Sequence, residues 1–245
     1  MIIKWQLLRY LFASYTRSYR YFAPIAFMII TLLLLYSYKP NPVMDSYAVT
    51  STLLFIGCAW LGMNFLNHDQ GRQTVLLILH TGSARAFYAT QYAALIVIGF
   101  VLSVLAVVYP VLTGMFDEPV GIERFTLALL SHLSLSLLGA VISLYFQSGW
   151  IENQGRSIGL LLILMVMSIA GLSVGDSLPD AFIVVAYILP PASLVIDMLM
   201  NTDERGLASG AIMLLYTYIY TAVILLIYLK IACSKDAAEI IRKSG

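Results

Sequence analysis

The sequence is short of charged residues. Only 11% of its 245 residues are Asp, Glu, Lys or Arg, whereas 60% are hydrophobic. A soluble globular protein carries roughly 25% charged residues, and a soluble domain of this size could not bury so much apolar surface. The 14 basic and 13 acidic residues nearly cancel, which excludes the strongly basic face of a nucleic-acid-binding protein. Disorder, which needs low hydrophobicity and high net charge, is also excluded, so we expect a membrane protein.

Residues for catalysis are scarce as well. Cys58 and Cys233 lie in apolar runs and predict neither a disulfide nor a zinc site. The sequence lacks a G-x-S-x-G elbow and an H-E-x-x-H motif. The closest approach to a phosphate loop, 149–157, has the wrong glycine spacing and an Arg in place of the Lys. We therefore expect no catalytic residue, no metal site and no ATP site in this chain.

Six windows between charged residues are long and apolar enough to cross a bilayer, which takes about 20 residues. They predict spans at 21–38, 46–66, 88–114, 125–148, 157–175 and 208–230. These windows contain no charged residue, except for Lys230 at the end of the last one. This disfavours an embedded enzyme or an ion-coupled carrier, because both usually need polar groups at membrane depth. The sequence therefore predicts a single all-α membrane domain over 1–245 with six transmembrane helices.

A shorter window, 181–196, is interrupted by Pro190 and Pro191. Proline removes a backbone donor and breaks a helix. The window predicts a re-entrant helical hairpin over 178–201, not a seventh span. Basic residues set the orientation, because they favour the cytoplasmic side. With the N-terminus inside, all of the 14 basic residues except Lys39, Arg124 and Arg205 are cytoplasmic. Both termini are therefore predicted inside, and the hairpin outside.

Residues 1–20 form an amphipathic pattern. One side of the predicted helix carries Gln6, Arg9, Thr16, Arg17 and Arg20 together with Ala13, and the opposite side carries Trp5, Leu8, Leu11, Phe12, Tyr15 and Tyr19. Such a pattern is typical of a helix lying in the membrane interface with its cations towards phosphates. The alternative is a simple basic anchor for the first span.

The predicted cytoplasmic segment 67–87 contains a second short helix. Arg72 to Leu79 would place Val75, Leu76 and Leu79 on one side, and Gly82 and Ser83 end the helix. Its exposed apolar residues need a cover, so the helix could dock another protein or rest on lipid. The short loop from Glu152 to Arg156 could be a second contact or an ordinary polar turn.

Taken together, six spans, an amphipathic N-terminal helix, a helix between spans two and three and a proline-broken outer hairpin resemble the permease subunits of type-2 ABC exporters, the ABC-2 family. The resemblance covers nearly the whole chain. The coupling segment of the family matches at Asp69, Gly71, Thr74, Leu76–Leu77, Gly82–Ser83 and Arg85. The chain departs from the pattern where Arg72 and Gln73 separate Gly71 from Thr74, and where Gly82 replaces a proline. Pro190 and Pro191 resemble the break in the outer hairpin of the family.

The resemblance implies a homo- or heterodimer of permease chains and two cytoplasmic ATPase subunits, which would bind ATP and Mg²⁺. The ATPase-coupling residues would be Asp69, Gly71, Arg72, Thr74, Leu76, Leu79, Ser83, Arg85, Glu152 and Arg156. The substrate pathway would include Thr50, Ser51, Asn64, Met165, Met167, Ser168 and Ser173. Helix packing is the alternative role of each pathway residue.

The function implied by this resemblance is export of a hydrophobic or amphipathic cargo, with a peptide or bacteriocin favoured, across a bacterial cell membrane. ATP hydrolysis would take place in the partner ATPase, so the chain itself would not be an enzyme. Two other functions stay open: a membrane-embedded enzyme, and a non-catalytic membrane scaffold or sensor subunit.

Overall fold

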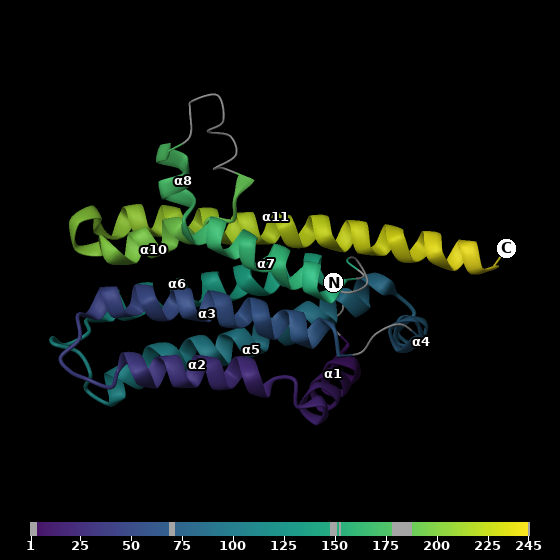
Figure 1. Ribbon diagram of the computed structural model, residues 1–245, viewed down its shortest axis with the longest axis horizontal. Helices are drawn as coiled ribbons and strands as arrows, with labels where there is room; N and C mark the ends of the chain where they lie inside the picture. The colour runs from purple at the N-terminus through teal and green to yellow at the C-terminus, as the bar shows by residue number, and fades with distance from the viewer. Residues whose placement is uncertain (1–3, 69–71, 148–150, 152, 178–187, 245) are drawn as a thin grey trace.

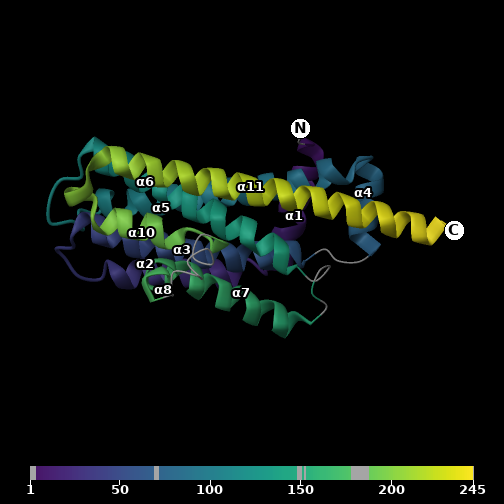
Figure 2. The same ribbon diagram turned by 90° about the horizontal axis from the view of Figure 1, so that it is seen from above.

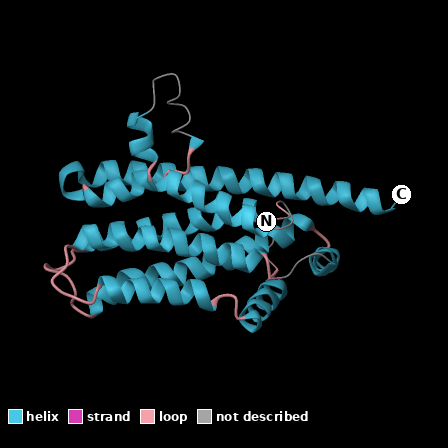
Figure 3. Ribbon diagram, in the orientation of Figure 1, coloured by secondary structure: helices cyan, strands magenta, loops and turns pink. Residues whose placement is uncertain are grey.

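The computed structural model describes residues 4–68, 72–147, 151, 153–177 and 188–244. Within these ranges the chain is helical and forms no β-strand (Figure 3), which confirms the all-α prediction. The helices are α1 (Trp5–Ser18), α2 (Phe22–Leu35), α3 (Val43–Leu66), α4 (Arg72–Thr81), α5 (Ala84–Leu112), α6 (Ile122–Ser143), the 3-10 turn η1 (Leu144–Phe146), α7 (Gln154–Ile169), α8 (Gly171–Ser177), α10 (Ala192–Met200) and α11 (Thr202–Ser244).

The long helices lie roughly along one axis and alternate in direction (Figure 1). The turns that follow α2 and α5 meet at one end of this bundle, where Asn41 and Phe116 form an isolated bridge. Helices α1 and α4 lie at the opposite end, together with the C-terminal end of α11. Figure 2 shows the same separation from above. The bundle therefore has one end made of tight turns and one end made of additional helices.

Within the described ranges, four helices are long and apolar enough to cross a membrane: Val43–Leu66, Ala84–Leu112, Ile122–Phe146 and Ser209–Ser234. A fifth candidate is the pair α1 and α2, which is bent by 79° at its break. Predicted spans 46–66, 88–114, 125–148 and 208–230 lie on the first four helices. The predicted span 21–38 lies on α2, which has 14 residues. The predicted span 157–175 lies on α7, which has 16 residues, and continues into α8. Neither α2 nor α7 alone reaches the 18 residues of a candidate span. The part of the chain that the structure describes is thus helical and contains four or five candidate membrane spans.

The centre of the bundle is the pair α3 and α6, which pack more closely than any other two helices among the described residues. Small residues make this approach possible. A Cβ atom on Gly139 would overlap the backbone carbonyl of Phe55, and one on Gly62 would overlap the Ser143 hydroxyl. Close contact between small residues is how membrane helices associate when lipid supplies no hydrophobic drive. Outward-facing side chains of α2, α5, α7 and α11 are largely apolar and exposed, as lipid-facing surfaces require.

The segment between α7 and α11 is irregular. Helix α8 points away from the bundle after α7 (Figure 1). The chain is broken at Pro190 and Pro191, and α10 then packs between α3 and α11. The Ser168 hydroxyl of α7 donates a 2.7 Å hydrogen bond to the Pro190 carbonyl and ties the break to the bundle. Of the predicted hairpin 178–201, residues 178–187 lie outside the described residues.

Candidate functional site

The short helix predicted within 67–87 is present as α4, and a sharp turn at Gly82 and Ser83 ends it. Gly82 has a φ of +73°, which a residue with a Cβ rarely adopts. Its N–H donates a 3.0 Å hydrogen bond to the Ile78 carbonyl and closes the helix. Ser83 then caps α5 by accepting a 3.3 Å hydrogen bond from the Ala86 N–H. Two residues thus join α4 to α5, so α4 is closely attached to a candidate span.

One side of α4 is apolar and uncovered. Leu76 is 65% exposed and Leu79 is 62% exposed, with Val75 beside them. The opposite side holds the helix to the protein, because Ile78 and Thr81 are buried. The predicted apolar face is therefore present and exposed, on a helix that lies at the end of the bundle (Figure 1). We call Val75, Leu76 and Leu79 the α4 face.

Helix α1 holds α4 at both of its ends. The Lys4 ammonium donates to the carbonyl of Thr81, the last residue of α4. A cation at a helix C-terminus is favoured by the helix dipole. The Lys4 N–H donates a 3.3 Å hydrogen bond to Thr90 Oγ1 of α5. Near the start of α4, Gln73 Nε2 donates to the Tyr10 hydroxyl at 2.7 Å.

Helix α1 and the turn after it also contact the C-terminal end of α3. The Tyr15 ring is buried and meets Phe65 edge-on, with 5.0 Å between ring centroids, and its hydroxyl donates to the Leu61 carbonyl at 3.4 Å. Burial raises the pKa of Tyr15 above its ordinary value, and the charge of Arg20 opposes this shift less strongly. Arg20 Nη1 donates to the Asn67 carbonyl at 2.6 Å, and Asn64 Nδ2 donates to the Arg20 carbonyl at 3.1 Å. Helix α1 thereby links α3, α4 and α5.

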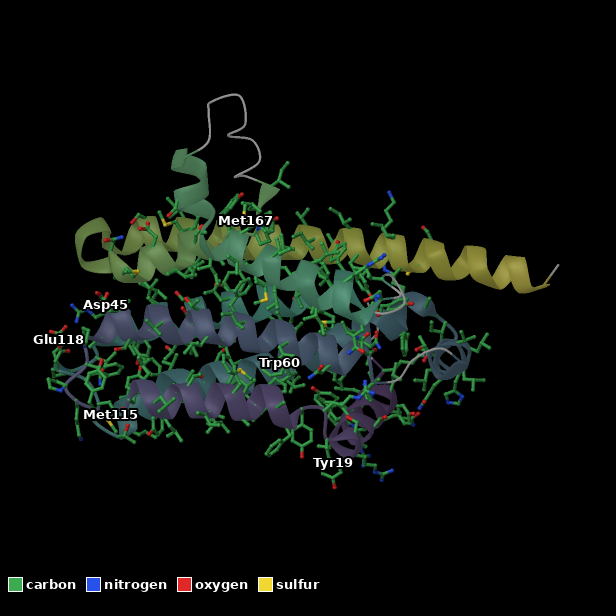
Figure 4. The ribbon with its side chains drawn as sticks, in the orientation of Figure 1. Tyr19, Asp45, Trp60, Met115, Glu118 and Met167 are labelled. Carbon is green, nitrogen blue, oxygen red and sulfur yellow. The ribbon has the colours of Figure 1, made fainter. Side chains whose placement is uncertain are left out.

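This arrangement refines the prediction of an interfacial N-terminal helix. The apolar residues Leu8, Leu11 and Tyr15 of α1 are buried against the protein, so they do not rest on lipid. Trp5 and Tyr19, from the same predicted face, are exposed near the two ends of the helix, and Figure 4 shows Tyr19 pointing away from the bundle. An amphipathic pattern shows that a helix has an apolar face, but it does not show what covers that face.

The other predicted coupling residues lie in several places. Thr74 is half-buried on α4, Ser83 caps α5, and Arg85 is exposed in the first turn of α5. Arg156 lies on α7, where its N–H donates a 3.0 Å hydrogen bond to Asn153 Oδ1. Arg72 begins α4. Asp69, Gly71 and Glu152 lie outside the described residues.

The predicted pathway residues have different surroundings. Thr50, Ser51, Met165 and Ser168 are buried in helix packing, and Met167 is half-buried on α7 (Figure 4). Asn64 bonds to Arg20, as described above, and Ser173 is exposed on α8. Of this set, Met165, Met167 and Ser168 share α7.

The structure also forms a buried hydroxyl–imidazole pair that the sequence pattern does not predict. Thr50 Oγ1 lies 2.9 Å from His132 Nε2, between α3 and α6. The second ring nitrogen faces the Ala128 carbonyl at 2.7 Å instead of a carboxylate. Because this carbonyl stands where a catalytic triad has its orienting acid, and both side chains are buried, the pair does not form a triad. The two residues are 82 positions apart, and no motif spacing could have revealed their contact.

The described residues also bring together no group of three His, Cys, Asp or Glu that could hold a metal ion.

Comparison with known protein families, with curated proteins and with solved structures found no match to this chain.

Proposed function

We propose that the chain is the membrane-spanning permease subunit of an ATP-driven exporter of the ABC-2 type. In this proposal it crosses the membrane six times, with α2 as the first span and with α7 and α8 in the fifth, and the segment 178–201, which includes α10, forms a re-entrant outer hairpin. Both termini and α4 face the cytoplasm. Separate ATPase subunits bind α4, and two permease chains enclose the pathway.

The α4 face carries this proposal. An exposed apolar helix face beyond the end of a bundle needs a cover, and a helix seated in a partner groove buries such anchors. Two basic residues, Arg9 on α1 and Arg85 in the first turn of α5, are exposed, and α1, α4 and the start of α5 lie at the same end of the bundle (Figure 1). This distribution fits the cytoplasmic side of a membrane protein. An ATPase subunit is the occupant that the coupling-segment resemblance favours.

The attachment of α4 supplies a route for mechanical work. A push on α4 would reach α5 through the Gly82–Ser83 turn, and it would reach α3 through α1. The contacts along this route are the Lys4–Thr81 bond and the paired bonds of Arg20 with Asn64 and Asn67. Closure of the ATPase subunits on ATP could thereby move two candidate spans together.

The cargo assignment rests on the apolar character of α7. Met165 and Met167 can adapt to irregular apolar shapes, and the exposed residues Leu162, Ile163 and Val166 extend the apolar surface of this helix. A hydrophobic or amphipathic peptide of the bacteriocin type suits such a surface better than a highly charged solute.

The proposal is tested by purifying the tagged protein in mild detergent and identifying its partners by mass spectrometry. A Leu76→Asp, Leu79→Asp double variant places two charges on the α4 face and should lose a stoichiometric ATPase. The matched control, Leu76→Met with Leu79→Met, keeps the face apolar and should retain it. Recovery of a partner without a nucleotide-binding site, or of an ATPase that the Asp variant still binds, would contradict the proposal.

A further inference from the structure

A cavity of about 320 Å³ lies between α6, α7, α11 and the proline break. Its wall includes Ile142, Tyr145, Leu164, Pro190, Tyr220 and Ile224. It is roughly twice as large as the ~150 Å³ apolar cavity that holds benzene in a well-studied protein. It therefore has room for a ligand much larger than one water molecule.

The wall is largely apolar and offers a polar ligand few hydrogen-bond partners. Two tyrosine hydroxyls are its polar side-chain groups, and each is engaged by a backbone carbonyl. Tyr145 donates to the Ile224 carbonyl at 2.7 Å, and Tyr220 donates to the Ile188 carbonyl at 2.5 Å. A buried water typically makes about three hydrogen bonds, and this wall offers too few partners for it. An apolar ligand gives up no hydrogen bond on entering the cavity, because it makes none in its surroundings.

The position of the cavity identifies the source of an apolar occupant. Tyr220 and Ile224 lie near the middle of the candidate span Ser209–Ser234. The neighbouring residues Ile163 on α7 and Val223 on α11 are exposed and apolar, as expected of a lipid-facing surface. Ile188 lines the cavity and is also 68% exposed. The cavity is therefore open at a surface where the surrounding solvent is hydrocarbon.

We infer that this cavity binds one hydrocarbon chain, either the acyl chain of a bilayer phospholipid or the lipid tail of an acylated amphiphile. Pro190 forms part of the wall and accepts the hydrogen bond from Ser168, so the bound chain packs directly against the break before α10. This inference does not depend on the exporter proposal, because it uses only the cavity and its membrane setting.

The test is photo-crosslinking of the full-length protein in lipid vesicles. One arm uses phosphatidylcholine with a diazirine in the middle of its acyl chain, and the other adds a diazirine-labelled palmitoylated peptide. We expect crosslinks on cavity residues of α6, α7 or α11 above the level on exposed faces. Labelling in the first arm identifies bilayer lipid as the source, and labelling only in the second identifies an acylated amphiphile.

Matched variants make the result specific to the cavity. Leu164→Trp and Ile224→Phe fill it from two helices and should lower cavity labelling about tenfold, because each added ring occupies space that the hydrocarbon chain would take; a tenfold loss of occupancy corresponds to about 1.4 kcal/mol. Ile163→Trp and Val223→Phe place the same rings on neighbouring exposed positions and should leave labelling unchanged. Two separate filling variants guard against one that misfolds, which its elution profile would show. Absence of enrichment in both arms, or equal labelling in filled and control variants, would overturn the inference.

Discussion

His132 Nε2 lies 2.9 Å from Thr50 Oγ1 and joins α6 to α3 inside the most closely packed helix pair of the described chain. The other ring nitrogen, Nδ1, donates to the Ala128 carbonyl at 2.7 Å, so Nε2 is the acceptor and the Thr50 hydroxyl is the donor. A neutral imidazole satisfied on both nitrogens can be buried between two apolar helices at little cost. The pair therefore acts as a polar contact that fixes how α3 and α6 meet.

Thr50→Val should lower the free energy of unfolding by about 1–2 kcal/mol, because it keeps the side-chain shape and leaves a buried imidazole nitrogen without a donor. The matched control is Thr52→Val. Thr52 is half-buried on the same helix and donates only within its own helix, to the Ala48 carbonyl at 2.8 Å. Its replacement should change stability by less than about 0.5 kcal/mol. Equilibrium unfolding in mixed detergent micelles measures both, and equal losses would contradict the account.

Gly139→Ala should destabilise the protein by about 1–3 kcal/mol, since the added methyl group meets the Phe55 carbonyl and forces α3 and α6 apart. Gly159→Ala on α7 is the contrasting variant, because nothing lies within 4 Å of its added Cβ. That change should stabilise α7 by about 0.5–1 kcal/mol. Thermal unfolding of the two variants should therefore move in opposite directions from that of the parent protein.

Much of the fold follows from the sequence, because charged residues cannot lie at membrane depth and so mark the ends of apolar helices. The charge-free windows 46–66 and 88–114 lie on α3 and α5 to within four residues at each end. The end of α7 at Ile169 was not predicted, because Gly171 is one of several glycines in apolar stretches. The role of Gly171 becomes clear only from the tertiary structure. A Cβ atom on Gly171 would lie 2.8 Å from the hydroxyl oxygen of Ser193, the second residue of α10.

The candidate site was predictable in part for a similar reason. The spacing of Leu76 and Leu79 on a short helix indicates a shared face whatever surrounds it, and that face is exposed. The contacts that hold it were not predictable, since Lys4 and Thr81 are 77 positions apart. The same holds for α1, whose apolar face is covered by protein and not by lipid. A periodic pattern shows that a face is apolar, but tertiary packing decides what it contacts.

Lys4→Met should loosen α4, because it removes the cation that bonds to the carbonyl of its last residue, Thr81. We expect faster amide hydrogen exchange over α4, equivalent to about 1 kcal/mol of lost protection. Arg9→Met removes an exposed cation from the same helix and should leave exchange over α4 unchanged. If both variants accelerate exchange equally, general surface charge and not the Lys4 contact holds α4 in place.

Cysteine labelling tests the proposed topology. In a background with Cys58→Ala and Cys233→Ser, single cysteines at Ser37, Glu118 and Met200 should react with an impermeant reagent added outside intact cells. Cysteines at Ser83 and Asn153 should react only after the membrane is opened. Asn153 directly precedes α7 and Met200 ends α10, so the two together decide whether the chain between them, in which α7 is the proposed span, crosses the membrane. Labelling of both from the same side would remove α7 from the spans.

The most direct measurement is photo-crosslinking from the α4 face in living cells. A photoreactive amino acid at Leu76 should yield one major protein adduct, and mass spectrometry should identify that protein as an ATPase with a nucleotide-binding site. The same group at Leu33, an exposed apolar position on α2, should yield no ATPase adduct. Adducts from Leu76 to lipid alone, or to a protein that binds no nucleotide, would contradict the role of α4 as the coupling helix.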